Sequence, residues 1–371
     1  MVLEPFGGGS HAAFYGDWAR FSRHRFTVLE LPAVHWKWRS RHSSLSLAEQ
    51  AAAASRRGRP FDLVFCSEML NLAEWRGFAI HDLRDLPAVV YFHENQFTYP
   101  LAPGLLRDHH YGYSNILTAI AADQLWFNTE FHRSEFTQAA RSWLRRMPDY
   151  KHLEKFEAAC ERSLVRTPGI VPKFFAHDER QHRSPTIGWV ARWEHDKAPE
   201  RFVDAIIALD RQGLDFQLCL LGQRFVQQPE CLSRLRDIAG PRILYSGYAE
   251  SRNEYWQLLA SMDLVVSTAD HEFFGMAILE AVAAGARPGV PRRLAYPEVF
   301  GLEKHPCHAQ FFYESTTEAL VEWLRREITT ETWRMRPVEL QQFIERYHWQ
   351  NLVVGYDDAI AELCSAGRRS S

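Results

Sequence analysis

The chain has 371 residues, of which 46% are hydrophobic and 24% are charged, and its formal net charge is −3. This composition is typical of a globular protein, and the length suits two domains that each bury a core. No apolar run approaches the roughly 18 residues of a membrane span, and no charged leader precedes an apolar stretch, so we expect a soluble, cytoplasmic protein. The six cysteines include no Cys-x-x-Cys pair, which argues against a zinc knuckle.

Short apolar or aromatic runs in the first half end in polar residues, a pattern that predicts buried parallel strands. They are VLEPF, DLVFCSEML, AVVYFHEN and QLWFNTEF, and helical patterns such as SLAEQAAAA lie between them. Three prolines among mixed polar residues over 166–185 predict a domain boundary. We therefore expect a Rossmann-like domain over residues 1–170.

Two polar segments of this first half follow predicted strands. GGGSH over 7–11 follows the first strand, and its glycines permit close approach of a phosphate or sugar. It lacks the G-x-G-x-x-G spacing that a nicotinamide enzyme requires. A polar cluster at the end of AVVYF consists of His93, Glu94, Asn95 and Gln96. A single histidine is more often structural, but a polar cluster directly after an apolar strand is typical of a binding site.

Residues 20–59 carry nine Lys or Arg against two Glu, an uneven distribution that the small net charge conceals. In WKWRSR over 36–41, tryptophans alternate with cations, so an extended segment would have one aromatic and one cationic side. Such a segment suits RNA, because cations hold phosphates while indole rings stack on bases. Alternatively, Trp36 and Trp38 fill the core of the domain and the cations form a solvated face.

A second series of strand patterns comes after the boundary. PTIGWVAR, FQLCLLG, RILYSG and LVVSTAD predict strands, with helices at ERFVDAIIALDRQ, NEYWQLLASM and the segment after FFG. We expect a second Rossmann-like domain over 185–345 and a helix over 346–371 that packs back on the first domain. The predicted fold class is α/β, with two Rossmann-like domains facing across a cleft at the carboxyl ends of their strands.

The second half places charged residues after two of its strands. Arg192 and Lys197 follow PTIGWV, where they are suited to neutralise a diphosphate leaving group, although two solvated charges explain them as well. In HEFFGMAILEAVAAG over 271–285, Glu272 lies in the loop and Gly275 begins a helix whose first N-H groups suit a diphosphate. Glu280 on that helix suits a sugar hydroxyl. Alternatively, Glu272 caps the helix and Glu280 is solvated.

Together these residues resemble the retaining family-4 glycosyltransferases of the GT-B fold, whose signature is E-x7-E after a strand with an Arg/Lys pair upstream. Further segments resemble one family within them, the tRNA-queuosine alpha-mannosyltransferases. These segments are GGSH, WKWRSR, FHENQ-x-x-YP, YGYSNIL over 111–117, FFGMAILEAV and YPEVF. The resemblance covers nearly the whole chain, and only the N-terminal segments point to this acceptor.

The resemblance implies transfer of mannose from GDP-mannose to the cyclopentenediol of queuosine in the anticodon of tRNA-Asp, with retention and without a covalent enzyme intermediate. The resemblance makes residues 1–170 the acceptor (tRNA)-binding domain and residues 185–345 the nucleotide-sugar-binding domain. The implied catalytic residues are His93 and Glu272. The implied donor site consists of Gly8, Gly9, Ser10, Arg192, Lys197, Phe274, Gly275, Met276 and Glu280. The implied acceptor site consists of His11, Trp36, Trp38, Arg39, Arg41, Glu94, Asn95, Gln96, Tyr113 and Asn115.

We expect no metal, because the chain contains no Asp-x-Asp motif to anchor a metal-diphosphate complex. Two alternatives remain open. A family-4 enzyme with a lipid or small-molecule acceptor would have the same second half and a basic amphipathic helix, a character that residues 130–146 share in part. A non-catalytic nucleotide-sugar or RNA-binding module would tolerate the loss of His93 and Glu272, which are both present.

Overall fold

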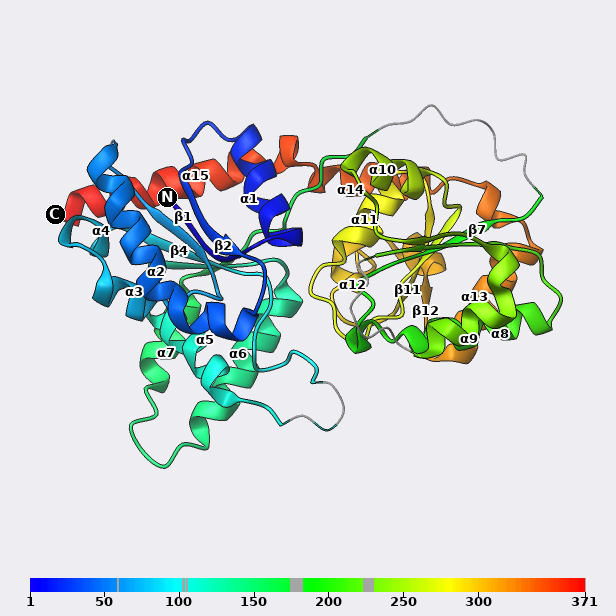
Figure 1. Cartoon of the computed structure of the whole chain (residues 1–371), viewed down its shortest axis with the longest axis horizontal. Helices are drawn as coiled ribbons and strands as arrows, with labels where there is room; N and C mark the ends of the chain where they lie inside the picture. Colours follow the sequence, from blue (N-terminus) through cyan, green and yellow to red (C-terminus); the bar gives the residue numbers. More distant parts are fainter. Residues whose placement is uncertain (59, 102–103, 105, 174–182, 223–229, 371) are drawn as a thin grey trace. The chain divides into compact units, whose positions relative to one another are not determined.

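The computed structural model describes the chain except for residues 59, 102–103, 105, 174–182, 223–229 and 371 (Figure 1). The chain divides into two compact units. Unit 1 comprises Met1–Tyr99, Leu105–Gly169 and Trp349–Ser371, and unit 2 comprises Pro100–Gly104 and Ile170–His348. The predicted boundary over 166–185 contains the passage from one unit to the other, and its residues 174–182 lie outside the described residues.

Unit 1 is built on a six-stranded parallel sheet with the order β2-β1-β3-β4-β5-β6. The strands are β1 (Val2–Gly7), β2 (Val28–Pro32), β3 (Val64–Ser67), β4 (Ala88–Phe92), β5 (Gln124–Phe127) and β6 (Ser163–Val165). The strand predictions for β1, β3, β4 and β5 are confirmed, whereas β2 and β6 are not predicted. The strand order reverses between β1 and β3, and open α/β sheets bind ligands beyond the carboxyl ends of the strands at such a point.

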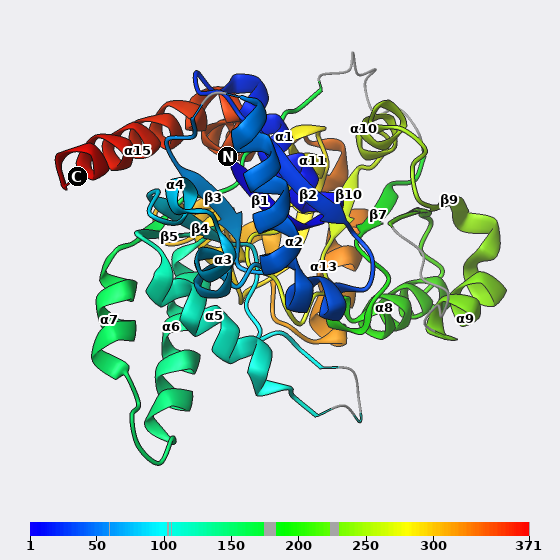
Figure 2. The same cartoon turned by 60° about the vertical axis from the view of Figure 1, so that its left-hand side comes forward.

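Helices cover both faces of this sheet, which is why its central strand β4, AVVYF, is apolar and buried throughout. They are α1 (Gly9–Phe21), α2 (Trp36–Arg57), α3 (Leu72–Phe78), α4 (His81–Arg84), α5 (His109–Ala121), α6 (Glu130–Arg145), α7 (Leu153–Glu161) and α15 (Trp349–Ser370). One core joins α2, α3, α5, α6 and α7 to the same face of the sheet. On the other face, α1 and α15 lie together (Figures 1 and 2).

The last helix is held to unit 1 by buried polar contacts. Asp357 on α15 is 3% exposed and accepts from the Trp18 indole at 3.2 Å, the Ser22 hydroxyl at 2.6 Å and the Arg23 backbone N-H at 2.8 Å. Tyr356 donates to the carbonyl oxygens of residues 166 and 167. The helix that the sequence predicts over 346–371 is therefore an integral part of unit 1.

Unit 2 has a second six-stranded parallel sheet, with the order β12-β11-β10-β7-β8-β9. Its strands are β7 (Thr186–Val190), β8 (Gln217–Leu221), β9 (Ile243–Gly247), β10 (Leu264–Val266), β11 (Arg287–Pro291) and β12 (Phe312–Tyr313). The four predicted strands are β7 to β10, whereas β11 and β12 are not predicted. Here the strand order reverses between β7 and β10.

The helices of unit 2 include the three that the sequence predicts, α8, α10 and α11. The α-helices are α8 (Pro199–Arg211), α9 (Glu230–Ala239), α10 (Arg252–Ala260), α11 (Met276–Ala283), α12 (Tyr296–Val299), α13 (Thr317–Thr329) and α14 (Val338–Ile344). Short 3-10 helices are η1 (His195–Lys197), η2 (Gly240–Arg242), η3 (Pro306–Phe311), η4 (Thr332–Arg334) and η5 (Glu345–Tyr347). Within the described residues of both units, no helix combines the length and the apolar composition needed to cross a membrane.

Candidate functional sites

The carboxyl ends of β7 and β10 bring Lys197 to Glu272 in unit 2. These strands are parallel neighbours, and Lys197 ends η1 after β7 while Glu272 lies in the loop after β10. The Lys197 amine donates to the carbonyl oxygen of His271 at 2.9 Å, and it lies 3.4 Å from Glu272 Oε2 and 3.1 Å from Asp196 Oδ2. The predicted cation therefore lies between two carboxylates, and an anionic ligand has to share it with them.

Hydrogen bonds between the two strand-end loops fix this arrangement. The Thr268 hydroxyl donates to the carbonyl oxygen of Lys197 at 2.7 Å, and it accepts from the Trp189 indole at 3.2 Å. The backbone N-H of Asp270 donates to the carbonyl oxygen of Asp196 at 2.8 Å. Sequence reasoning misses Thr268 and Trp189, since nothing in either segment signals a pairing of residues 79 positions apart.

Burial and neighbouring charges act in opposite directions on the Lys197–Glu272 pair. Burial alone lowers the pKa of Lys197, but Glu272 and Asp196 raise this pKa above its ordinary value. Burial alone raises the pKa of Glu272, but Lys197 and the backbone N-H of Phe274 lower it. At neutral pH, Lys197 is therefore a fixed positive charge and Glu272 a fixed carboxylate.

The second predicted cation, Arg192, lies within electrostatic range of the same group. Its side chain is 47% exposed and pairs with Glu194 at 3.4 Å. Its charge is one of those that lower the pKa of His271, which falls to about 4 mainly through burial and then through Lys197. His271 is therefore neutral at neutral pH, and Arg192 is the more accessible of the two predicted phosphate-binding cations.

Glu272 also closes the turn that precedes α11. Its Oε1 accepts from the backbone N-H groups of Phe274 at 3.3 Å and of Gly275 at 3.0 Å. Gly275 has a φ of +87°, and a Cβ at this position would lie 2.7 Å from the Tyr296 ring, so both conformation and space require glycine. Two of the three backbone N-H groups of the turn over 274–276 therefore donate to Glu272, while Met276 begins α11, and the contact of this turn with phosphate or sugar stays a prediction.

Glu280 is buried on α11 and held from a neighbouring helix. Its Oε2 accepts from the Tyr255 hydroxyl on α10 at 2.6 Å, and Arg252 lies 4.0 Å from its Oε1. Burial and the carboxylate together raise the pKa of Tyr255 well above its ordinary value, so the phenol keeps its proton. The solvated alternative for Glu280 is excluded by its 8% exposure. Tyr255 and Arg252 carry no signal in the sequence that assigns them to this site.

The strand ends of unit 1 form a second polar group around two histidines. Glu4 on β1 lies 3.2 Å from the Nδ1 of His11, which belongs to the first turn of α1. The His11 ring lies on that of His93, which follows β4, with 4.0 Å between ring centroids. Burial alone lowers the pKa of His11, but Glu4 raises it to about 9, whereas burial and the charge of His11 lower the pKa of His93. An imidazolium thus faces a neutral imidazole.

The glycines that precede His11 start α1 without a side-chain cap. Gly8 is the N-cap residue, and a Cβ there would lie 2.5 Å from the Ala33 Cβ, so the close approach of two chain segments requires glycine. Gly9, with a φ of +54°, and Ser10 are exposed in the first turn. The predicted donor-binding turn over 8–10 is therefore accessible at the N-terminus of a helix.

The loop after β4 is held by a residue that the sequence does not reveal. Glu68, directly after β3, accepts from the backbone N-H groups of His93 at 3.0 Å and Glu94 at 3.3 Å. Asn115 accepts from the backbone N-H of Gln96 at 3.0 Å and donates to the carbonyl oxygen of Glu68 at 3.0 Å. Burial raises the pKa of Glu68 to about 8. Glu68 and Asn115 together fix the backbone that carries His93.

Two predicted acceptor residues require correction. Asn95 is fully buried, and its amide oxygen accepts from the backbone N-H groups of Phe97 and Thr98 at 3.0 Å each. Asn115 is 3% exposed and is committed to the loop contacts above. Both asparagines therefore shape the loop and offer no side chain to RNA. Glu94 and Gln96 are partly exposed and hydrogen-bond to each other at 3.1 Å.

Glu4, His11 and His93 offer ligand atoms that all lie within 4.8 Å of one another, a spacing suited to a metal ion. A metal ion would have to displace the proton of His11, and the pKa of about 9 makes this displacement costly at neutral pH. We therefore expect EDTA to leave the rate of the reaction unchanged. The rate is measured with and without EDTA, and a loss that added magnesium or manganese restores would contradict this expectation.

The basic aromatic segment WKWRSR forms the first six residues of α2, which corrects the predicted extended conformation. Its tryptophans therefore do not share one side, but both are exposed, Trp36 by 39% and Trp38 by 62%. Trp36 lies 5.0 Å from the Tyr111 ring, and the Arg41 guanidinium lies 4.9 Å over that ring. The core alternative for the tryptophans is thus excluded, and α2 and α5 share an exposed cluster of rings and cations.

Comparison with known proteins assigns both halves of the chain. Residues 1–170 match the model of the tRNA-queuosine alpha-mannosyltransferase N-terminal family, and residues 171–335 match that of glycosyl transferases group 1. A tRNA-queuosine alpha-mannosyltransferase of Drosophila melanogaster is 35% identical over 316 residues, 82% of each chain. A GDP-mannose-dependent alpha-(1-6)-phosphatidylinositol dimannoside mannosyltransferase of Mycobacterium tuberculosis is 27% identical over 53% of this chain and 48% of its own.

Solved structures share the fold at low sequence identity. The Anabaena protein Alr3699/HepE, solved in complex with UDP, has a TM-score of 0.68 and 18% identity over 98% of this chain and 99% of its own. Sucrose-phosphate synthase from Thermosynechococcus elongatus has a TM-score of 0.64 and 16% identity, covering 94% and 82%. The predicted two-domain α/β fold of the GT-B glycosyltransferases is confirmed. Since the Drosophila relative is matched over most of its length and the first half fits its own family model, the chain belongs to the tRNA-queuosine alpha-mannosyltransferase family.

Proposed function

We propose that this glycosyltransferase transfers mannose from GDP-mannose to the cyclopentenediol of queuosine in the anticodon of tRNA-Asp, with retention at the anomeric carbon. The identity of 35% to the Drosophila relative over 82% of both chains carries the proposal. The name of that relative supplies the acceptor. The donor follows from the sequence resemblance, and the mycobacterial relative that is named GDP-mannose-dependent supports it.

The strand-end residues of unit 2 fit the donor. Arg192 and Lys197 hold the diphosphate, whose negative charge grows as the anomeric bond breaks, so they act most strongly in the transition state. Glu272 accepts hydrogen bonds from the transferred sugar, and Glu280, held by Tyr255, accepts them from the ribose. A carboxylate has about four acceptor sites, so each of these glutamates retains capacity beyond its protein contacts.

In the proposed reaction, retention requires no covalent enzyme intermediate. The bond between the anomeric carbon and the phosphate oxygen breaks, and the acceptor hydroxyl attacks the same face. The hydroxyl proton passes to the departing phosphate, which is its nearest base. His93, kept neutral by burial and by His11, contacts the sugar or lies along the path of this proton. The retaining stereochemistry, the absence of a metal and the cytoplasmic location remain predictions.

A lipid acceptor is the alternative that the mycobacterial relative raises. The amphipathic segment over 130–146 is the feature of the sequence that favours it. In the structure this segment forms α6, whose apolar residues Phe136, Ala140 and Leu144 are at most 3% exposed and pack in the core of unit 1. The apolar face of α6 is therefore occupied, and α6 offers no apolar face to a lipid surface.

One assay separates these functions. The chain is incubated with labelled GDP-mannose, GDP-glucose, UDP-glucose or UDP-galactose, each with queuosine-containing tRNA, with phosphatidylinositol vesicles or without an acceptor. We expect label in tRNA from GDP-mannose above all. Labelled lipid would support the lipid acceptor, label in tRNA from a different sugar would overturn the donor, and tight nucleotide-sugar binding without any transfer would support a non-catalytic module.

The exposed cluster at the start of α2 predicts how tRNA binding responds to salt. Changing Arg39 and Arg41 together to alanine should weaken tRNA binding and lower the slope of log Kd against log salt by up to about two units, since each lost phosphate contact removes about one. Binding is measured by fluorescence anisotropy at salt concentrations from about 50 to about 300 mM. This range of about sixfold is wide enough to determine the slope.

A control for this prediction lies on the same helix. Arg56 and Arg57 are exposed at the other end of α2, and their change to alanine removes the same net charge. This control should leave the slope near that of the unaltered chain. Equal slopes for both double variants would remove the start of α2 from the tRNA-binding surface.

A further inference from the structure

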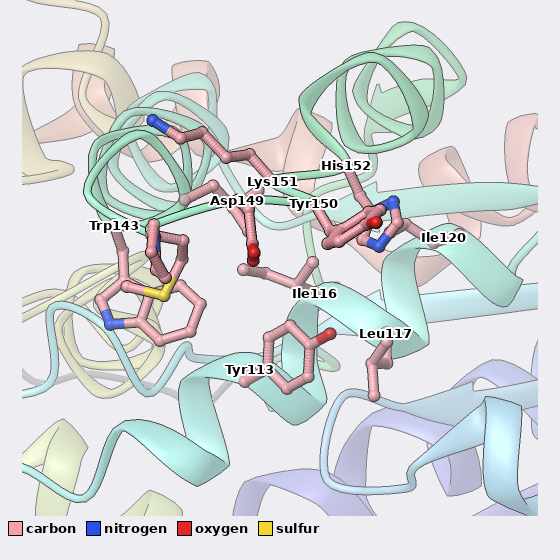
Figure 3. A pocket seen from close by; sticks show the side chains of 12 residues that line it. Tyr113, Ile116, Leu117, Ile120, Trp143, Asp149, Tyr150, Lys151 and His152 are labelled. Carbon is pink, nitrogen blue, oxygen red and sulfur yellow. The ribbon is translucent and has the colours of Figure 1, made fainter.

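A groove in unit 1 lies between α5, α6 and the loop that leads to α7 (Figure 3). Its volume is about 330 Å³, near the lower limit of pockets that bind small ligands. Apolar side chains such as Ile116 and Leu144 lie at its base, and three aromatic residues line it, Tyr113 from α5, Trp143 from α6 and Tyr150 from the loop. The groove is therefore of a size and lining that suit one flat ring system.

The rings around the groove are exposed to an unusual degree for their size. Tyr113 is 37% exposed and lies 5.6 Å from the Trp143 ring, and Tyr150 is 84% exposed. Large aromatic side chains with one wet face and one apolar face are enriched at binding surfaces. Two exposed aromatic side chains at one groove indicate a surface on which a ring of a ligand stacks.

The loop that presents Tyr150 has a specific and unfavourable backbone conformation. Tyr150 has a φ of +39° and His152 a φ of +51°, values that residues other than glycine adopt rarely. The Lys151 amine donates to the carbonyl oxygen of Arg145 at 2.7 Å and thereby ties the loop to the end of α6. Strained backbone that the surrounding structure maintains is concentrated at ligand-binding sites.

The charges at this end of α6 favour an anionic partner. The segment over 145–155 has four cations and two anions, namely Arg145, Arg146, Lys151 and Lys155 against Asp149 and Glu154. Arg145 and Arg146 are exposed where the helix ends. A groove lined by rings, next to an excess of positive charge, has the two elements with which proteins bind single-stranded nucleic acid.

Helix α5 carries one ring of the groove and one ring that contacts the exposed cluster of α2. Tyr111 on α5 contacts Trp36 and Arg41 of that cluster, and Tyr113, two residues later on the same helix, contacts Trp143 at the groove. Residues two apart on a helix point to nearly opposite sides, so the first turns of α5 present one ring to each group. The two groups therefore lie on different sides of α5.

We propose that this groove binds a second, unstacked nucleobase of the RNA acceptor, distinct from the base that receives the sugar. The base stacks on Tyr113 and Tyr150, and the neighbouring cations hold the adjoining phosphates. Unpaired bases of an RNA loop are available for such stacking, whereas bases within a helix are not. This inference rests on the proposed function only in taking RNA as the acceptor.

The test compares paired variants in binding to an anticodon stem-loop RNA. Tyr150→Ala and Tyr113→Ala should each raise the Kd by about fivefold to a hundredfold, whereas Tyr150→Phe and Tyr113→Phe retain the stacking face and should bind as the unaltered chain does. Phe78→Ala removes an exposed ring of unit 1 outside the groove and should have no effect. RNA with 5-bromouridine in the loop should crosslink to peptides that contain Tyr113 or Tyr150.

The outcomes distinguish this inference from the proposed function. If the unaltered chain glycosylates queuosine-containing tRNA but both alanine variants bind RNA normally, and crosslinks map elsewhere, the groove is not a nucleobase site. If Tyr150→Ala instead weakens binding to phosphatidylinositol vesicles and not to RNA, the groove belongs to a lipid and the inference is overturned. If the unaltered chain neither binds nor glycosylates tRNA, the proposed function itself fails.

Discussion

Lys197→Ala is expected to lower kcat/KM for sugar transfer by about two to three orders of magnitude, the usual loss when one positioned group that stabilises transition-state charge is removed. The reason lies in the surroundings of the amine. It is 14% exposed and fixed by the carbonyl oxygen of His271 and by two carboxylates, so in the proposed reaction its charge is already positioned before the diphosphate leaves. Arg192 is more exposed and cannot take its position. The measurement is the steady-state rate with GDP-mannose and queuosine-containing tRNA.

The same surroundings require a stability control. Without Lys197, the buried carboxylate of Asp196 and that of Glu272 lose their common partner, and an uncompensated buried charge destabilises the fold. The thermal unfolding temperature of Lys197→Ala is therefore measured beside its rate, which is expressed per folded protein. Lys304→Ala removes an exposed lysine of unit 2 and should change neither quantity. A folded Lys197→Ala chain with unreduced kcat/KM would exclude the proposed role.

Transfer to tRNA-Asp that carries guanine in place of queuosine is expected to remain at background. The nucleophile in the proposed reaction is a hydroxyl of the cyclopentenediol. Guanine lacks this hydroxyl, so a higher protein concentration should not restore transfer. The loss is therefore in kcat, and it should not be accompanied by a comparable loss of tRNA binding, because phosphate contacts and stacking dominate affinity. Label incorporation and anisotropy are measured on both tRNAs at the same salt concentration.

The control for this prediction uses the same transcript. Unmodified tRNA is converted to the queuosine form and assayed again, and transfer should appear without any other change. Equal labelling of both tRNAs would show that the diol is not the acceptor. In that case the ribose or another base hydroxyl would have to be located by digestion and mass spectrometry of the labelled nucleoside.

Much of the fold follows from local patterns in the sequence. Parallel strands that helices cover on both faces need continuous apolar runs, and AVVYF and LVVSTAD can be identified for that reason. The carboxyl ends of such strands lie at one edge of a sheet, so the approach of Lys197 to Glu272 is also predictable once both strands are assigned. The strands β2, β6, β11 and β12 are not predicted, although the predicted strands β3, β5 and β10 are equally short. The sequence of β11, RPGVP, has two prolines and a glycine, which favour a turn, whereas β2 is largely exposed and lacks a continuous apolar run. The strands β6 and β12 have only three and two residues.

The first six residues of α2 show that a short pattern can predict the wrong secondary structure. Six residues of alternating rings and cations fit a strand as well as a helix, so WKWRSR by itself does not decide between them. The later residues of the segment decide for a helix, since Leu47, Ala48 and Ala51 pack on the sheet at helical spacing and the helix extends back to Trp36.

By itself, the sequence determined eight of the twelve described strands in their order, the two loops that carry Arg192, Lys197 and Glu272, and the family. Only the tertiary structure decided which partners hold these groups. Glu68 holds the loop that carries His93, and Tyr255 holds Glu280. The side chain of Asn95 accepts hydrogen bonds from the backbone of its own turn. The contacts of Glu68 and Tyr255 join residues that are distant in the chain and that the topology of the sheet brings together. The role of Asn95 depends on its burial. A short window of sequence shows neither the long-range contacts nor the burial.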